Sequence, residues 1–78
     1  MNWIRIQEPN GEKFLNSSQL YDVTFNDDRK CVTFSYRGQD SIYTRTVQFS
    51  RYDDAKKDLK EQLMMHHRDF VLDTAKYL

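Results

Sequence analysis

The chain has 78 residues, and its 12 basic side chains balance 12 acidic ones, so the formal net charge is zero. A chain of this length forms one domain, residues 1–78, and buries only about 60% of the surface that its unfolded form exposes. Its aromatic content of 14% argues against a disordered chain. The chain from Ser50 onwards has six basic and six acidic residues, and so has the part before it. Neither half therefore has the basic excess typical of nucleic-acid-binding proteins.

Cysteine content and hydropathy indicate the compartment. Cys31 is the only cysteine, which excludes a disulfide within the chain, and the first residues form no apolar leader. No stretch approaches the roughly 20 apolar residues that a membrane-spanning helix needs. We therefore expect a cytoplasmic protein that has no membrane partner.

Residues 1–49 have the alternation and the turn signals of strands. Residues 3–7 alternate between apolar and polar side chains, which predicts a first strand with Ile4 and Ile6 on one face. A Pro-Asn-Gly turn follows, because Asn-Gly readily adopts the backbone of a tight hairpin. Residues 14–16 then return as a second strand, with Leu15 expected opposite Ile6.

Three further strands form a meander over residues 20–49. Residues 20–25, 31–37 and 42–49 each alternate, and polar turn clusters separate them. The alternation places one set of side chains on a common face: Tyr21, Val23, Phe25, Val32, Phe34, Tyr36 and Val47.

The register of the two turns supports this common face. A turn at Asp27-Asp28 places Val23 opposite Val32, and the next turn places Tyr36 opposite Tyr43. Both turns bring the apolar set to the same side, as a sheet with one buried face requires. The other face is rich in Ser, Thr, Asp and Gln.

Residues 50–78 have a helical pattern. Ser50, followed three residues later by Asp53, fits an N-terminal capping signal, and neither Gly nor Pro occurs beyond it. The helix either continues to the end or breaks near His66 and begins again at Asp69. Residues that recur at helical spacing predict its buried face: Tyr52, Ala55, Leu59, Leu63, His66 and Phe70.

These elements predict an α+β fold, in which a meander sheet of four to five antiparallel strands is covered on one face by a long or broken C-terminal helix. A continuous helix from residue 50 to 78 would span roughly 40 Å, whereas a strand of typical length covers about 17–20 Å. Apolar side chains near the C-terminus would then extend past the sheet. Either a second helix folds back onto the core, or these side chains form a dimer or partner surface.

The second interpretation predicts a protein partner, a homodimer, or both, bound through the C-terminal helical region. Trp3 either adds an exposed aromatic anchor near the other terminus or covers a sheet edge. The residues assigned to partner binding are Trp3, Met64, His67, Phe70, Val71, Tyr77 and Leu78.

Catalytic, metal and cofactor motifs are not evident in the sequence. His66 and His67 are adjacent, so on a helix their side chains diverge by about 100° and do not easily share one metal ion. Cys31 has no neighbouring His or Lys at motif spacing. The pairs Asp27-Asp28 and Asp53-Asp54 suit a turn and a helix N-terminus, and nothing in the sequence indicates the raised pKa that acid–base catalysis needs. We therefore predict no enzyme, no metal site and no cofactor.

An alternative site surrounds the hairpin of the last two strands. Tyr36, Arg37, Tyr43 and Arg45 interleave aromatic and basic side chains, and several sheet proteins use this combination to bind single-stranded nucleic acid. The simpler interpretation is that the tyrosines border the core and Arg37 is solvated. Arg45 falls among apolar neighbours, where it extends to solvent, stacks on Phe34 or pairs with an acid of the helix.

Two resemblances accompany these patterns. The Asn-Gly-Glu-Lys-Phe segment of residues 10–14, followed by Asn16, a short strand, a Val-Thr-Phe strand and a terminal helix, resembles the small flagellar FlbD-like proteins. The chain departs from them in its long C-terminal extension and its Thr- and Arg-rich strand at residues 42–49. In size and architecture the chain also looks like phage-encoded inhibitors, including anti-CRISPR proteins.

The surplus of apolar side chains near the C-terminus, together with the lack of a chemical motif, favours one function. We predict a small intracellular protein–protein interaction module, an inhibitor or regulator that occupies the surface of its partner. The alternative is a module that binds single-stranded nucleic acid through sheet aromatics and arginines.

Overall fold

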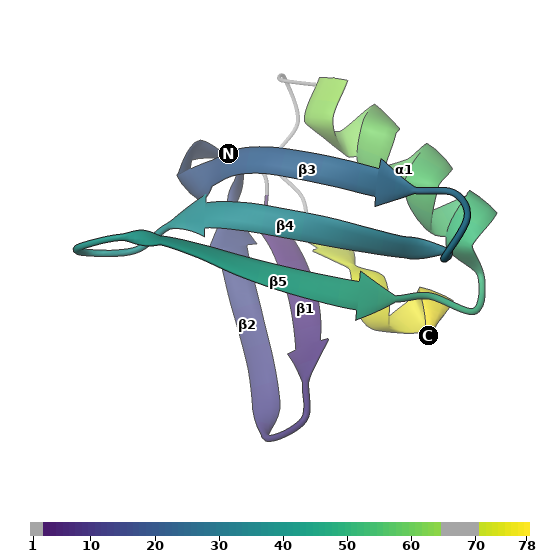
Figure 1. Ribbon diagram of the computed structural model, residues 1–78, viewed down its shortest axis with the longest axis horizontal. Coiled ribbons are helices and arrows are strands. Elements are labelled where there is room, and N and C mark those ends of the chain that lie inside the picture. Colours follow the sequence, from purple (N-terminus) through teal and green to yellow (C-terminus); the bar gives the residue numbers. More distant parts are fainter. Residues whose placement is uncertain (1–2, 65–70) are drawn as a thin grey trace.

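The computed structural model describes residues 3–64 and 71–78 (Figure 1). The elements in chain order are β1 (Trp3–Glu8), β2 (Gly11–Asn16), the short 3₁₀ helix η1 (Ser17–Gln19), β3 (Leu20–Asn26), β4 (Cys31–Arg37), β5 (Ile42–Gln48), α1 (Tyr52–Met64), β6 (Val71–Asp73) and the 3₁₀ helix η2 (Thr74–Tyr77).

The strands form two three-stranded sheets. The first, here called the meander sheet, has the order β3–β4–β5 and is antiparallel throughout. The second, the mixed sheet, has the order β2–β1–β6, with β2 antiparallel and β6 parallel to β1. Figure 1 shows the meander sheet crossing in front of β1 and β2 at a steep angle. The α+β class is therefore confirmed, whereas a single meander of four to five strands is wrong.

The register within the meander sheet follows the predicted alternation. Tyr36 lies opposite Tyr43, as expected. Val23 lies opposite Phe34 instead of Val32, because the loop between β3 and β4 is longer than a turn at Asp27-Asp28. A shift of two residues keeps every side chain on its face, so the apolar set still points to the core.

Two details of the strands differ from expectation. Leu15 lies opposite Ile4 instead of Ile6, again a shift that preserves the core face. The register of β3 is irregular between Leu20 and Asp22, and a bulge of this kind leaves one residue outside the regular alternation. Tyr21 is that residue and is exposed, so its prediction as a core-facing side chain is wrong.

The helix α1 begins later than its predicted cap. The amide of Ala55 donates to the carbonyl of Arg51, which places the first helical hydrogen bond one residue after Ser50. The Ser50 hydroxyl instead donates to the carbonyl of Tyr77 at 3.3 Å. The serine therefore joins the start of α1 to the C-terminal segment and does not cap the helix.

The C-terminal segment does not form the predicted α-helix, although residues 74–77 form the 3₁₀ helix η2. Residues 71–73 form strand β6, in which Leu72 pairs with Ile4 and is buried. The Thr74 hydroxyl donates to the carbonyl of Arg5 at 2.6 Å. Hydrogen bonding and burial beside β1 stabilise the strand more than helix propensity would stabilise a helix in so short a segment, because helix propensities are fractions of a kcal/mol per residue. The predicted helix break near His66 and Asp69 lies outside the described residues.

One core joins the two sheets, α1 and η2. The helix contributes Ala55 and Leu59 from its predicted stripe, and the ring of Tyr77 meets Phe49 edge-on at 6.0 Å between centroids. Phe70, predicted for the same stripe, lies outside the described residues. The buried apolar side chains are Ile4, Ile6, Leu15, Val32, Phe34, Val47, Phe49, Tyr52, Ala55, Leu59, Leu72 and Tyr77.

The pairing of β6 with β1 can be tested by comparing two adjacent residues. Leu72→Ala should lower the free energy of unfolding by about 2–4 kcal/mol, because it empties a buried site. Val71→Ala, at an exposed position of the same strand, should lower it by less than about 1 kcal/mol. Urea denaturation followed by circular dichroism measures both values. Small and equal losses would contradict the place of β6 in the core.

Candidate protein-interaction surface

The outer face of the mixed sheet carries three exposed apolar side chains on three adjacent strands. Trp3 of β1 lies beside Val71 of β6 in register, and Phe14 of β2 points to the same side as Arg5. Trp3 is 37% exposed, Phe14 45% and Val71 53%. We call this face, with Trp3, Phe14 and Val71 at its centre, the apolar face.

One cation of the described residues, Arg5, lies among these side chains, and its charge is paired within the sheet. The guanidinium of Arg5 donates to Glu12 at 2.5 Å, to Asp73 at 2.9 Å and to Gln7 at 2.8 Å. The hydrogen bonds with Glu12 and Asp73 raise the pKa of Arg5. The amide of Ala75, followed by Arg5, lowers the pKa of Asp73, so the ion pairs persist at neutral pH.

The outer face of the meander sheet has a different character. Its alternate positions carry short polar side chains, as the sequence predicts, and the hydroxyls of Thr33 and Thr46 bond each other across β4 and β5 at 3.0 Å. Cys31 belongs to this face and is half-buried. Apart from Tyr21 at the bulge of β3, the exposed aromatic side chains that point away from the core therefore belong to the mixed sheet.

The remaining partner residues predicted from the sequence are placed as follows. Met64, at the end of α1, and Leu78 are exposed. Tyr77 is buried in the core, so it does not belong to an accessible surface. His67 and Phe70 lie outside the described residues.

Phe14 was missed in the sequence, although a signal for it was present. The alternation that turns Leu15 into the core turns Phe14 outward, to the side of Trp3. The residues next to Phe14 in the sequence, however, do not indicate a surface, because the apolar face forms only when β1, β2 and β6 pair.

The alternative nucleic-acid residues are only partly brought together. Tyr36, Tyr43 and Arg45 share the inner side of the meander sheet, since they occupy paired positions in β4 and β5. Arg37 is exposed and alternates to the opposite side. Lys13 of β2, which the sequence did not indicate, places its Nζ 4.9 Å from the centroid of the Tyr36 ring.

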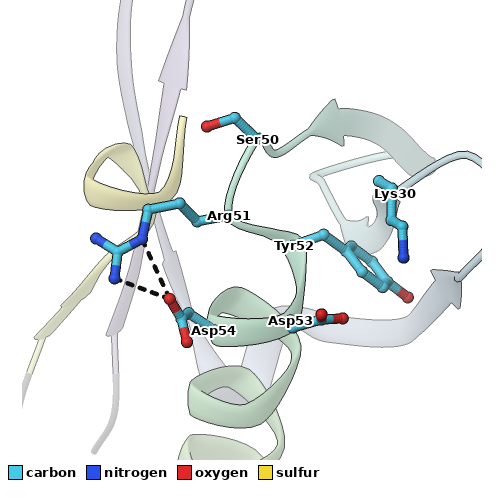
Figure 2. A pocket seen from close by; sticks show the side chains of 6 residues that line it. All are labelled: Lys30, Ser50, Arg51, Tyr52, Asp53 and Asp54. Carbon is cyan, nitrogen blue, oxygen red and sulfur yellow. Dashed lines mark hydrogen bonds and ion pairs between the residues drawn. The ribbon is translucent and has the colours of Figure 1, made fainter.

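A hollow of about 330 Å³ lies at the N-terminal end of α1 (Figure 2). Its lining residues are Lys30, Ser50, Arg51, Tyr52, Asp53 and Asp54. Arg51 donates to Asp54 at 2.8 Å, and Lys30 lies over the Tyr52 ring at 5.4 Å. Arg51, Asp54 and Lys30 thus engage one another or a ring, and we assign the hollow to the local structure of the helix start.

Residues 3–64 and 71–78 contain no group of three His, Cys, Asp or Glu side chains that could hold a metal ion. His66 and His67, the histidine candidates, lie outside that part. Of the helices that the structure describes, none has the length and apolar content for crossing a membrane.

Comparison with protein-family models, curated proteins and solved structures finds no match to the chain. The resemblances to FlbD-like proteins and to phage-encoded inhibitors therefore stay predictions, and the functional proposals below rest on side-chain geometry.

The hydroxyl of Tyr52 links α1 to the loop between β3 and β4. It donates to Asp27 at 2.5 Å, and Lys56 donates to the same carboxylate at 2.9 Å. Burial, followed by the hydrogen bond to Asp27, raises the pKa of Tyr52 to about 12 from its ordinary value of 10.0. The bonds from Tyr52 and Lys56 lower the pKa of Asp27.

This linkage predicts an alkaline loss of stability. Since the pKa of Tyr52 is higher in the folded chain, its stabilisation is complete below about pH 10 and is lost as the pH rises towards 12. Tyr52→Phe should therefore be less stable than the wild type at pH 7, and the difference in free energy of unfolding should shrink above pH 10. Urea titrations at several pH values measure this difference, with Tyr21→Phe as the exposed control. A constant difference across the range would contradict the assigned bond.

Proposed function

We propose that this chain is a small protein–protein interaction module that binds through the apolar face of its mixed sheet. The observation that carries the proposal is the joint exposure of Trp3, Phe14 and Val71 on three paired strands. Large aromatic side chains surrounded by a polar rim supply much of the binding energy at protein interfaces. A module of this kind acts by occupying a surface of its partner, as inhibitors and regulators do.

The state of Arg5 supports an apolar contact. Burial of an unpaired charge costs several kcal/mol, which would oppose docking on this face. Glu12 and Asp73 already bind the guanidinium, so a partner can cover it without supplying a counter-charge. The two carboxylates stay about half exposed and form a polar rim that can still hydrogen-bond across an interface.

A second copy of the chain is the first partner to consider. In a two-fold dimer the same patch meets itself, so the patch must be self-complementary. The apolar face suits such a contact through its apolar centre and through a rim that holds both donors and acceptors, and Glu12 and Asp73 against Arg5 leave one net negative charge at the rim of each copy. A stable interface covers about 800 Å² on each partner, which requires most of the mixed sheet and not the three side chains alone.

C-terminal truncation does not provide a clean test of this proposal. The segment after α1 supplies Leu72 and Tyr77 to the core, so its removal should unfold the chain. Point substitutions at exposed positions separate binding from folding.

Self-association should depend on the apolar face. Trp3→Ser should weaken dimerisation by about tenfold or more, because aromatic anchors at interfaces contribute about 2 kcal/mol or more. Ile42→Ser removes a similarly exposed apolar side chain from the β4–β5 hairpin and should leave dimerisation unchanged. Sedimentation equilibrium over a range of concentrations measures both constants. A chain that stays monomeric at the highest soluble concentration, or equal effects of the two changes, would remove the dimer proposal.

A further inference from the structure

The turn end of the β4–β5 hairpin carries a second cluster, formed by Lys13, Tyr36, Tyr43 and Arg45 and here called the tyrosine cluster. The rings of Tyr36 and Tyr43 stack with 5.9 Å between centroids and 29° between planes. Lys13 reaches the Tyr36 ring from the mixed sheet. Figure 1 shows the hairpin turn at the end of the meander sheet opposite α1, so the helix does not cover this end.

The glycine of the hairpin turn determines where the outer ring lies. A Cβ atom at Gly38 would lie 2.0 Å from a ring carbon of Tyr43, so only a residue without a side chain leaves space for the ring. The amide of Gly38 also donates to the carbonyl of Ser41 at 2.8 Å, which closes the turn. Tyr43 is thereby held against the backbone while 49% of it stays exposed.

Arg45 provides a cation that the rest of the structure does not use. Its Nε atom is shielded from solvent and has no hydrogen-bond partner among the described residues. The side chain as a whole is half-buried and forms no ion pair within the described residues, so its positive charge stays available to an anionic ligand. Pairing with an acid of the helix, one of three alternatives that the sequence left open for Arg45, does not occur within residues 3–64 and 71–78.

Three cations lie at or beside the tyrosine cluster, against one acid, Asp40, in the hairpin turn. Lys13, Arg37 and Arg45 take part in none of the ion pairs that the described residues form. Glu12, the chain neighbour of Lys13, points to the other side of the sheet and binds Arg5. The zero net charge of the chain therefore conceals a local excess of unpaired cations beside exposed aromatic rings.

We propose that the tyrosine cluster binds single-stranded nucleic acid. A base stacks on the exposed ring of Tyr43, and Arg45 and Lys13 contact the adjacent phosphates, with Arg37 meeting the strand from the other side of the hairpin. Aromatic rings accept any base through its π-face, while nearby cations follow the backbone. A duplex hides the faces of its bases, so the single strand is the form that fits. This site lies on the inner side of the meander sheet and is independent of the apolar face.

The test uses the full chain and a short, fluorescently labelled oligothymidine, with binding measured by fluorescence anisotropy at several salt concentrations. Three phosphate contacts predict a slope of about −2 for log K against log salt, at roughly 0.7 for each contact. Arg45→Ala should reduce the size of this slope by about 0.7. Tyr43→Ala should weaken binding about fivefold or more without changing the slope.

Matched variants separate the cluster from general surface effects. Tyr21→Ala removes another exposed tyrosine of the same sheet, and Lys57→Ala removes an exposed cation of α1; both should bind as the wild type does. Gly38→Ala should also weaken oligothymidine binding, as Tyr43→Ala does, because the added methyl group displaces the Tyr43 ring without removing it. Circular dichroism verifies that each variant is folded.

Three results would overturn the proposal. The first is the absence of oligothymidine binding at low salt, and the second is equal affinity of the Tyr43→Ala and Tyr21→Ala proteins. The third is competition by polyphosphate as strong as that by unlabelled oligothymidine, because polyphosphate has charge without bases. Trp3→Ser should leave oligothymidine binding unchanged, so failure at this site is distinguishable from failure at the apolar face.

Discussion

The parallel pairing of β6 with β1 holds the two ends of the described chain together, and the remaining architecture depends on it. Leu72 enters the core beside Ile4, and the Thr74 hydroxyl bonds the carbonyl of Arg5. From there η2 carries Tyr77 into contact with Phe49. Because these contacts join residues far apart in sequence, they close the fold around one core that a chain of this size needs for stability.

The same pairing creates the surface to which we assign protein binding. It places Val71 next to Trp3 and brings Asp73 to Arg5, so one strand supplies both an apolar neighbour and a counter-ion. Without β6 the guanidinium would keep Glu12 as its acidic partner, and Trp3 would stand at a sheet edge. Folding and the proposed binding surface therefore share one structural cause, and only exposed positions such as Trp3 can be changed without affecting both.

The two proposed sites use charge in opposite ways. On the apolar face Arg5 is neutralised by two carboxylates, which favours contact with another protein surface. In the tyrosine cluster Arg45 lacks a partner within the described residues and Lys13 rests on an aromatic ring, which favours an anionic, aromatic ligand. Such a division is invisible in the net charge, because it depends on which acids and bases meet in space.

Local patterns in the sequence determined the positions of β1, β3, β4 and β5, the register of β4 against β5 and the start of the helix to within two residues. The opposition of Tyr36 to Tyr43 follows from alternation and one short turn, and both act between neighbours in the chain. Only the tertiary structure decided that β6 is a strand, that Tyr21 leaves the core face and that Lys13 reaches Tyr36. A three-residue strand has no periodicity of its own to detect, and a bulge or an inter-sheet contact is set by the packing of distant elements, which outweighs local preference.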